Sequence, residues 1–356
     1  ECLYRPEIRD LPVAVCGDPE ARHGIILAKN QVAKKYGIPT GEVIWKAKQL
    51  CPSLLCIPAN YSLYMHISQQ LRDIYGSYTD LVESFGLDEC WLDISEPGRT
   101  VEDGTRIANE IRERVKDEIG ITVSIGVSYN KIFAKLGSDY KKPDATTTIT
   151  RDNFRSIVWP LPASDLLYVG GRTDKKLRAR GIRTIGEIAN ADPEMMRHML
   201  GKNGLMLMRF ALGLDMSPVM PSSYESAVKS VGNSATLPHD IENLADAESV
   251  FYLLAESVGA RLREQGFRSR CINISVRTTD LIHYGCQLTL KSPTMITREI
   301  AQTALRLFKE RYMDLIPLRS VGISCTNLVP DTAPEQIGFL DDEEKRRKCE
   351  TLEHSL

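Results

Sequence analysis

Residues 83–93 constrain the fold of this chain more than any other stretch. They place a Gly-Leu-Asp-Glu segment between two short runs of β-prone residues, which predicts two strands joined by a tight turn containing Gly86. Side chains alternate between the faces of a strand, but a turn breaks this alternation, so Asp88 and Glu89 can converge on one point. Two neighbouring carboxylates repel each other unless a cation lies between them, and a hard divalent cation such as Mg²⁺ suits oxygen ligands. The stretch predicts a metal-binding turn, and a solvated acidic turn is the alternative.

The composition is typical of a globular chain without a membrane segment. The 356 residues are 42% hydrophobic with a mean hydropathy of −0.22, and no apolar run approaches the length of a membrane span. This length exceeds one ordinary core and predicts several domains. The nine cysteines are scattered without a zinc-site spacing, which argues against zinc and for reduced thiols in the cytoplasm.

Charge is distributed unevenly along the chain. The net charge is −2, but residues 151–221 carry eleven Lys and Arg against seven Asp and Glu, which amounts to +4. Residues 331–356 carry four against eight, which amounts to −4. The acidic C-terminal stretch therefore hides a basic middle in the total, and the basic middle is compatible with nucleic acid binding.

The first 150 residues predict two small α+β units. Strands are predicted at 11–16, 24–28 and 122–127, and helices at 30–36, 46–50, 61–78, 101–119 and 130–138. The elements from residue 61 onward predict one small sheet covered on one face by helices, with the carboxylate turn at its centre. A loop with Lys141, Lys142 and Pro143 follows the last of these helices.

A glycine turn at residues 169–171 precedes a basic helix in the middle of the chain. Thr173 and Asp174 are predicted to cap this helix, which leaves backbone N–H groups free at its start. Such groups bind a phosphate without reading a base. Lys175 and Lys176 follow on the helix and either add phosphate contacts or form a solvated face.

Residues 227–330 form a self-contained pattern after a linker-like segment at 217–226. Strands are predicted at 228–236, 271–278, 283–290 and 318–326, and helices at 246–265 and 297–312. This βαββαβ order is typical of a ferredoxin-like arrangement.

Taken together, these stretches resemble a Y-family translesion DNA polymerase of the DNA polymerase IV (DinB-like) and UmuC-like kind. The matching motifs lie, in the family's order, at residues 87–93, 126–131, 138–143, 169–177 and 181–186. One such motif alone is weak evidence, but five in this order are specific. The resemblance as a whole runs over nearly the entire chain.

The resemblance implies an α+β, multidomain right-hand polymerase. Its palm would be ferredoxin-like, its fingers small, its thumb helical with a helix-hairpin-helix, and its little finger of βαββαβ order. The domains would be residues 1–10 and 61–150 for the palm, 11–60 for the fingers, 151–221 for the thumb, 222–226 for a linker, 227–330 for the little finger and 331–356 for a tail.

The resemblance also implies template-directed DNA synthesis across damaged DNA, with two Mg²⁺ ions that promote nucleotidyl transfer from a dNTP to the primer 3′-hydroxyl. Asp88 and Glu89 would be two of three metal-binding carboxylates. Lys142 would contact the triphosphate, and Gln31 and Lys34 stand where the family has a Tyr and an Arg. Lys34 keeps the charge but not the planar grip of Arg. The residues implied in DNA binding are Gly170, Gly171, Thr173, Lys175 and Lys176.

The ends of the chain carry two further expectations. Residues 336–340 resemble the pentapeptide that bacterial polymerases insert into the sliding clamp, with Gln336, Phe339 and Leu340 as its anchors. The family's first strand, with a further metal aspartate and an aromatic gate against ribonucleotides, would lie before Glu1. We therefore expect this chain by itself to add no nucleotide. We also expect a monomer that binds primer–template DNA and dNTP, with no membrane contact.

Two alternatives of a different class remain open. One is a non-catalytic DNA-binding protein with a polymerase fold. The other is a nucleotide cyclase, because cyclase palms share the sheet and the carboxylate turn. The glycine turn and the 227–330 pattern count against a cyclase, since that enzyme needs no grip on a duplex.

Overall fold

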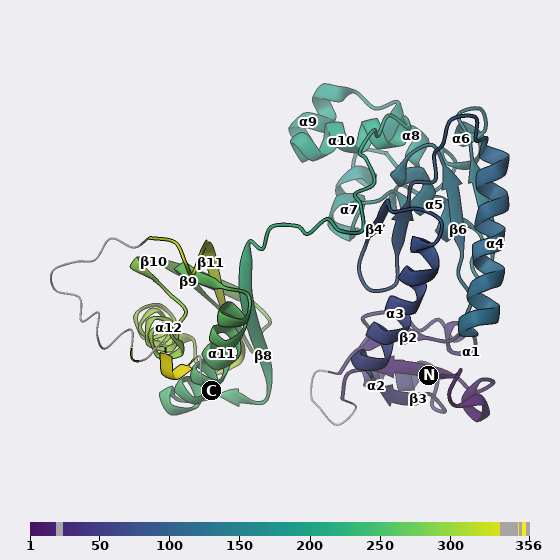
Figure 1. Ribbon diagram of the computed structural model, residues 1–356. Helices are drawn as coiled ribbons and strands as arrows, with labels where there is room; N and C mark the ends of the chain where they lie inside the picture. The colour runs from purple at the N-terminus through teal and green to yellow at the C-terminus, as the bar shows by residue number, and fades with distance from the viewer. Residues whose placement is uncertain (19–23, 335–347, 349–350, 354–356) are drawn as a thin grey trace. The chain divides into compact units, whose positions relative to one another are not determined.

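The computed structural model describes residues 1–18, 24–334, 348 and 351–353 (Figure 1). The chain divides into two compact units, one of residues 1–9 and 60–225 and one of residues 10–59 and 226–356. Among the described residues, no helix is both long enough and apolar enough to span a bilayer.

Residues 60–150 of the first unit combine helices with two separate pairs of strands. The elements of this part are α3 (Tyr61–Gly76), β4 (Val82–Ser84), β5 (Cys90–Leu92), α4 (Val101–Ile119), β6 (Ile125–Ser128), α5 (Lys131–Tyr140) and β7 (Thr146–Ile149). The same unit also contains the short helix η1 (Pro6–Ile8) near the start of the chain. Strands β4 and β5 are antiparallel, whereas β6 and β7 are parallel. The prediction of one sheet with the carboxylate turn at its centre is therefore corrected for the described residues, in which the two pairs are not hydrogen-bonded to each other.

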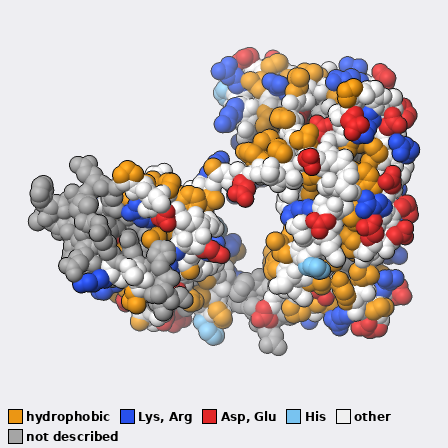
Figure 2. Space-filling model, viewed as in Figure 1, with side chains coloured by type: hydrophobic (Ala, Val, Ile, Leu, Met, Phe, Trp, Pro, Cys, Tyr) orange, Lys and Arg blue, Asp and Glu red, His pale blue; other side chains and the backbone are white. Residues whose placement is uncertain are grey.

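Helix α4 has the predicted bounds because local signals define both of its ends. Thr100 and Asp103 form a capping box at its start, and Gly120 ends it with a φ of 83°. Its apolar stripe packs against α3 through Ile107, Ile111 and other buried residues. On its outer face, acidic and basic side chains are mixed (Figure 2).

The rest of the first unit is helical and shares one core with α5. Its elements are α6 (Phe154–Ile157), η2 (Ala163–Asp165), α7 (Gly171–Arg178), α8 (Ile185–Ala189), α9 (Pro193–Leu200) and α10 (Lys202–Ala211). The Phe133 ring of α5 stacks on Phe154 with ring centroids 5.5 Å apart, and Trp159 meets Phe154 edge-on at 6.0 Å. Helix α5 therefore belongs to the helical core as well as to the β6–β7 pair.

In the second unit, residues 10–59 form a small sheet with two helices. The elements are β1 (Val13–Cys16), β2 (Ile26–Lys29), α1 (Gln31–Lys34), α2 (Ile44–Leu50) and β3 (Leu55–Pro58), and the strand order is β2-β1-β3. The predicted strands and helices of this part are all observed. The β3 strand, which the sequence analysis missed, runs parallel to β1.

Residues 226–334 of the same unit confirm the predicted βαββαβ order. The elements are β8 (Ser230–Ile241), α11 (Leu244–Glu264), β9 (Phe267–Thr278), β10 (His283–Thr294), α12 (Thr297–Arg311), η3 (Met313–Leu315) and β11 (Leu318–Pro330). The strand order is β10-β9-β11-β8, and all pairs are antiparallel. Helices α11 and α12 contact each other and the sheet (Figure 1). Phe251 and Phe308 pack in the core with their ring centroids 5.6 Å apart.

Helix α12 takes its N-terminal cap from far along the chain. Its N-cap residue, Ile296, offers no side-chain hydrogen bond. The Glu353 carboxylate instead accepts a hydrogen bond from Thr297 N at 3.0 Å and pairs with Arg263 Nη1 at 2.5 Å. An anion at a helix N-terminus is stabilised by the free N–H groups and the helix dipole. Glu353 therefore ties residues 351–353 to this part of the unit.

Candidate active site

The carboxylate turn joins β4 and β5 as the sequence predicts. Phe85 N–H donates to the Glu89 carbonyl at 2.8 Å and closes the turn. Gly86 adopts a φ of 81°, which favours glycine because other residues strain there. Strand pairing runs from Val82 opposite Leu92 to Ser84 opposite Cys90.

Helix α3 supports this turn from one side. The Ser68 hydroxyl donates a hydrogen bond to the Leu87 carbonyl, and Arg72 Nη2 donates to the Gly86 carbonyl at 3.4 Å. Ser68 is buried, so its contact joins the turn directly to the helix surface. The turn is therefore held through its backbone carbonyls, and these contacts do not involve the carboxylates of Asp88 and Glu89.

Asp88 and Glu89 have different surroundings. Asp88 is exposed, whereas Glu89 is half-buried and its Oε1 lies 3.1 Å from Lys135 Nζ on α5. Lys135 is only 17% exposed and also lies 2.5 Å from Asp139 Oδ2. Burial alone lowers the pKa of Lys135, but its hydrogen bonds with Asp139 and Glu89 outweigh burial and raise the pKa above its usual range. Lys135 therefore stays charged beside Glu89.

The acidic residues on either side of the turn have structural partners. Glu83 pairs with Lys131 Nζ at 2.6 Å and accepts a hydrogen bond from Met220 N at 2.8 Å. Asp93 accepts a hydrogen bond from Ser95 N at 2.9 Å, in a local turn. These contacts favour Asp88 and Glu89 as the metal-binding pair of this stretch.

The three residues predicted to bind nucleotide lie in both units. Lys142 follows α5 in the first unit, and its Nζ lies 2.6 Å from Asp139 Oδ1. Gln31 and Lys34 are exposed on α1 in the second unit, where Asn30 caps the helix by accepting a hydrogen bond from Ala33 N at 2.9 Å.

The glycine turn predicted at residues 169–171, called the glycine hairpin from here on, leads into α7. Gly170 is the N-cap and Gly171 the first helical residue, so no side chain caps this helix. The prediction that Thr173 and Asp174 form the cap is wrong, because the backbone enters the helix at the glycines and both residues lie in the first turn. Asp174 accepts a hydrogen bond from Arg178 Nε at 2.7 Å instead.

The hairpin surface is open. A Cβ atom on Gly170 or Gly171 would meet no other atom within 4 Å, so the packing of the chain itself does not require glycine at these positions. The free N–H groups at the start of α7 can therefore be approached by an anion. Lys175 and Lys176 are exposed on the same helix, and on the face shown in Figure 2 further Lys and Arg side chains lie over α9 and α10.

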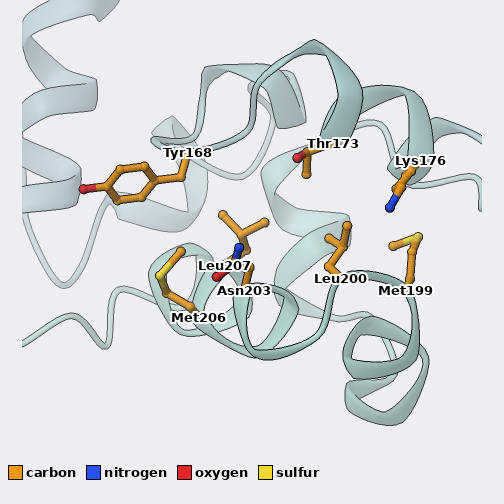
Figure 3. A pocket seen from close by; sticks show the side chains of 8 residues that line it. All are labelled: Tyr168, Thr173, Lys176, Met199, Leu200, Asn203, Met206 and Leu207. Carbon is orange, nitrogen blue, oxygen red and sulfur yellow. The ribbon is translucent and has the colours of Figure 1, made fainter. Parts of the chain in front are cut away.

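A cavity of about 300 Å³ lies next to the hairpin. Thr173 and Lys176 of α7 face residues of α9 and α10 across it, and Tyr168 lies at one end (Figure 3). The lining residues from α9 and α10 are Met199, Leu200, Asn203, Met206 and Leu207. Lys176 thus lies at the rim of a partly apolar hollow, whereas Lys175 does not line it.

Gln336, Phe339 and Leu340, the predicted clamp-binding residues, lie outside the described residues. Their assignment stays a prediction from the sequence.

The comparisons with known proteins agree with the fold. The impB/mucB/samB family matches residues 1–139, and the impB/mucB/samB family C-terminal domain matches residues 228–339. A DNA polymerase IV of Acetivibrio thermocellus is 51% identical over 356 residues, which are 100% of this chain and 89% of that protein. The chain belongs to the Y family of DNA polymerases.

Two further matches also cover most of the chain. A DNA polymerase IV of Clostridium acetobutylicum is 33% identical over 350 residues, which are 98% of this chain and 87% of that protein. A solved Y-family DNA polymerase chimera has a TM-score of 0.80 and 22% identity, and the match covers 92% of this chain and 95% of the chimera. The chain therefore has the fold of a Y-family polymerase over most of its length.

Y-family polymerases depend on divalent metal ions, and the donor chemistry of the turn fits such an ion. Asp88 and Glu89 offer hard oxygen ligands, which Mg²⁺ prefers. Within the described ranges, no group of three or more His, Cys, Asp or Glu residues is arranged to hold a metal. Mg²⁺ is commonly bound by one or two carboxylates, with water and substrate phosphate as further ligands, so this pair suffices for part of a site.

Sequence reasoning assigned no role to Lys135 or Asp139. Their spacing is that of an i,i+4 pair on a helix, which favours an ion pair between them. The contact of Lys135 with Glu89 has no such local signal, because it depends on how α5 packs beside the turn.

Proposed function

We propose that this polymerase carries out template-directed DNA synthesis across damaged DNA by transferring a nucleotide from a dNTP to the primer 3′-hydroxyl. The observation that carries the proposal is the exposed Asp88 and half-buried Glu89 at the β4–β5 turn, in a chain 51% identical to a DNA polymerase IV. The palm is assigned to residues 1–10 and 61–150, the fingers to 11–60, the thumb to 151–221, the linker to 222–226 and the little finger to 227–330.

Asp88 and Glu89 would hold two Mg²⁺ ions together with a further ligand. When bound, the ions supply activation of the 3′-hydroxyl and neutralisation of the departing pyrophosphate. The turn positions both carboxylates through the Phe85–Glu89 backbone hydrogen bond at 2.8 Å and the contacts from α3. Lys135 balances the charge of Glu89 and keeps that side chain in place.

Lys142, Gln31 and Lys34 would bind the triphosphate. Lys142 and Lys34 supply positive charge, and Gln31 supplies a hydrogen-bond donor without the ring that the family has there. The exposed side chains of Gln31 and Lys34 on α1 support this assignment. The protein would work as a monomer in the cytoplasm, where the eight free cysteines among the described residues would remain reduced.

Primer extension with all four dNTPs and Mg²⁺ tests the proposed function in the full-length protein. Extension across a lesion-containing template is the expected result. Binding of primer–template DNA without extension would favour a non-catalytic DNA-binding protein. A cyclic product from GTP or ATP, with no extension, would favour a cyclase.

The duplex would be held through its phosphates by the glycine hairpin and the little finger. Replacing Lys175 and Lys176 together with alanine is expected to flatten the slope of log K for DNA against log salt by about 0.9 for each phosphate that the protein no longer neutralises. Fluorescence anisotropy of labelled primer–template DNA at several salt concentrations measures this slope. Arg106→Ala is the control, because Arg106 lies on the outer face of α4 and is paired with Asp103. A slope unchanged from the native protein would assign the two lysines to a solvated face.

Residues 336–340 would bind the sliding clamp. Gln336 would supply hydrogen bonds, and Phe339 and Leu340 would fill an apolar pocket. Isothermal titration against the clamp of the same organism is expected to show binding by the native chain and loss of binding by Gln336→Ala/Phe339→Ala. Equal affinities of the two proteins would contradict the assignment.

A further inference from the structure

We propose that Asp139 is a positioning residue that links the metal-binding Glu89 to the nucleotide-binding Lys142. This inference rests on the function proposed above, because it concerns the same site. Asp139 forms ion pairs with Lys135 and Lys142, and it acts on the carboxylate turn through Lys135.

The geometry gives each oxygen of Asp139 its own lysine. Asp139 Oδ2 lies 2.5 Å from Lys135 Nζ, one turn earlier on α5, and Oδ1 lies 2.6 Å from Lys142 Nζ, in the loop after the helix. Lys135 Nζ lies in turn 3.1 Å from Glu89 Oε1. The four side chains therefore form one connected row in which negative and positive charges alternate.

Burial differs along this row. Lys135 is 17% exposed, so its contacts are partly shielded from water, whereas Lys142 and Asp139 are 46% and 51% exposed. An exposed pair contributes little to stability. The ion pair between Asp139 and Lys142 is therefore better explained as a contact that orients Lys142. It holds the long lysine side chain in one of its many rotamers.

The row also lies beside open space. Lys135 and Asp139 line a cavity of about 380 Å³ together with the loop from Ser164 to Gly170, which leads into the glycine hairpin. Ligands can thus reach these charged groups from the side of the hairpin. The row is not sealed within the core.

The charges predict how the row works. Lys135 is attracted to both Asp139 and Glu89. Because Asp139 offsets part of the positive charge of Lys135, Glu89 can bind a divalent cation as well. If Asp139 loses its charge, Lys135 attracts Glu89 alone and competes more strongly with the cation. Lys142 at the same time is no longer oriented by a carboxylate. One substitution is therefore expected to weaken both metal binding and nucleotide binding.

Asp139→Asn in the full-length protein tests the proposal. The KM for dNTP is expected to rise about tenfold, with a smaller change in kcat, and the affinity for Mn²⁺ alone, measured by isothermal titration, to fall about fivefold. Asp139→Glu restores the carboxylate and is expected to recover most of both losses. The control is Asp117→Asn, the same chemical change at an exposed position of α4. Thermal melting establishes that each variant is folded.

Double substitutions separate a positioning role from an independent one. In a Lys142→Ala background, Asp139→Asn is expected to raise the KM for dNTP no further, and in a Lys135→Met background it is expected to leave Mn²⁺ affinity unchanged. Additive effects in both backgrounds would overturn the proposal, as would native values of KM and Mn²⁺ affinity in Asp139→Asn. Absence of primer extension by the native full-length protein would overturn the proposed function instead, and the Mn²⁺ titrations would still decide whether Asp139 acts on the metal site.

Discussion

Asp88→Ala or Glu89→Ala is expected to abolish primer extension by the full-length protein while DNA affinity stays close to native. Each substitution removes an oxygen ligand from the turn and lowers the rate at least about a hundredfold, on the order of 3 kcal/mol or more in activation free energy. DNA affinity is retained because the proposed grip on the duplex lies at the glycine hairpin and not at the turn. Single-turnover extension assays and anisotropy with the same labelled DNA measure the two quantities.

Asp93→Asn is the matched control for these variants. Asp93 is a carboxylate just beyond β5, which follows the carboxylate turn. It accepts a hydrogen bond from Ser95 N at 2.9 Å, and an asparagine oxygen could accept the same bond. We expect this variant to extend primers at nearly the native rate. Near-native extension by Asp88→Ala or Glu89→Ala would remove the turn from the mechanism, and loss of extension by Asp93→Asn would add Asp93 to it.

Gly126→Ala is expected to destabilise the first unit by on the order of 3 kcal/mol or more, because α5 packs directly on β6 at this glycine. A Cβ on Gly126 would lie 1.9 Å from the Ala134 carbonyl oxygen and 2.6 Å from Ser138 N. Both are backbone atoms of α5, so no side chain can rotate away to relieve the overlap. Helix α5 must move off the strand or the strand must bend.

The effect is expected to reach the active site, since α5 also carries Lys135 and Asp139. Urea unfolding followed by tryptophan fluorescence measures the loss, with Trp91 as a reporter because its indole donates to the Lys131 carbonyl at 2.9 Å. Gly76→Ala is the control: a Cβ there would meet no atom within 4 Å, so stability should change by less than about 0.5 kcal/mol. Native stability in Gly126→Ala would contradict the close packing of α5 on β6.

The position of α5 explains how the fold brings the parts of the site together. One part of the helix packs on Phe154 in the helical core of the first unit, and another contacts β6 and β7. Because one rigid element takes part in both cores, the carboxylate turn and the glycine hairpin are supported by the same helix. Lys135 and Asp139 on this helix line a cavity together with residues 164–170.

Features that depend on neighbouring residues could be predicted from the order of the amino acids alone. The carboxylate turn follows from Gly86 and the β-prone runs on either side, and the bounds of α4 follow from Thr100, Asp103 and Gly120. The βαββαβ order of residues 226–334 follows from periodicity over long elements. Such signals are short-range, because backbone conformation, capping and side-chain alternation all act within a few residues.

Contacts between segments that are distant in the sequence became visible only in the folded chain. The ion pair of Lys135 with Glu89, the cap that Glu353 places on α12, and the pairing of β6 with β7 all require two segments to be packed side by side. Helix α7 begins at Gly171 with Gly170 as its N-cap, so the favourable capping residues Thr173 and Asp174 did not mark the start of this helix. Residue type shows which contacts a side chain is able to make, whereas packing selects the partner it meets.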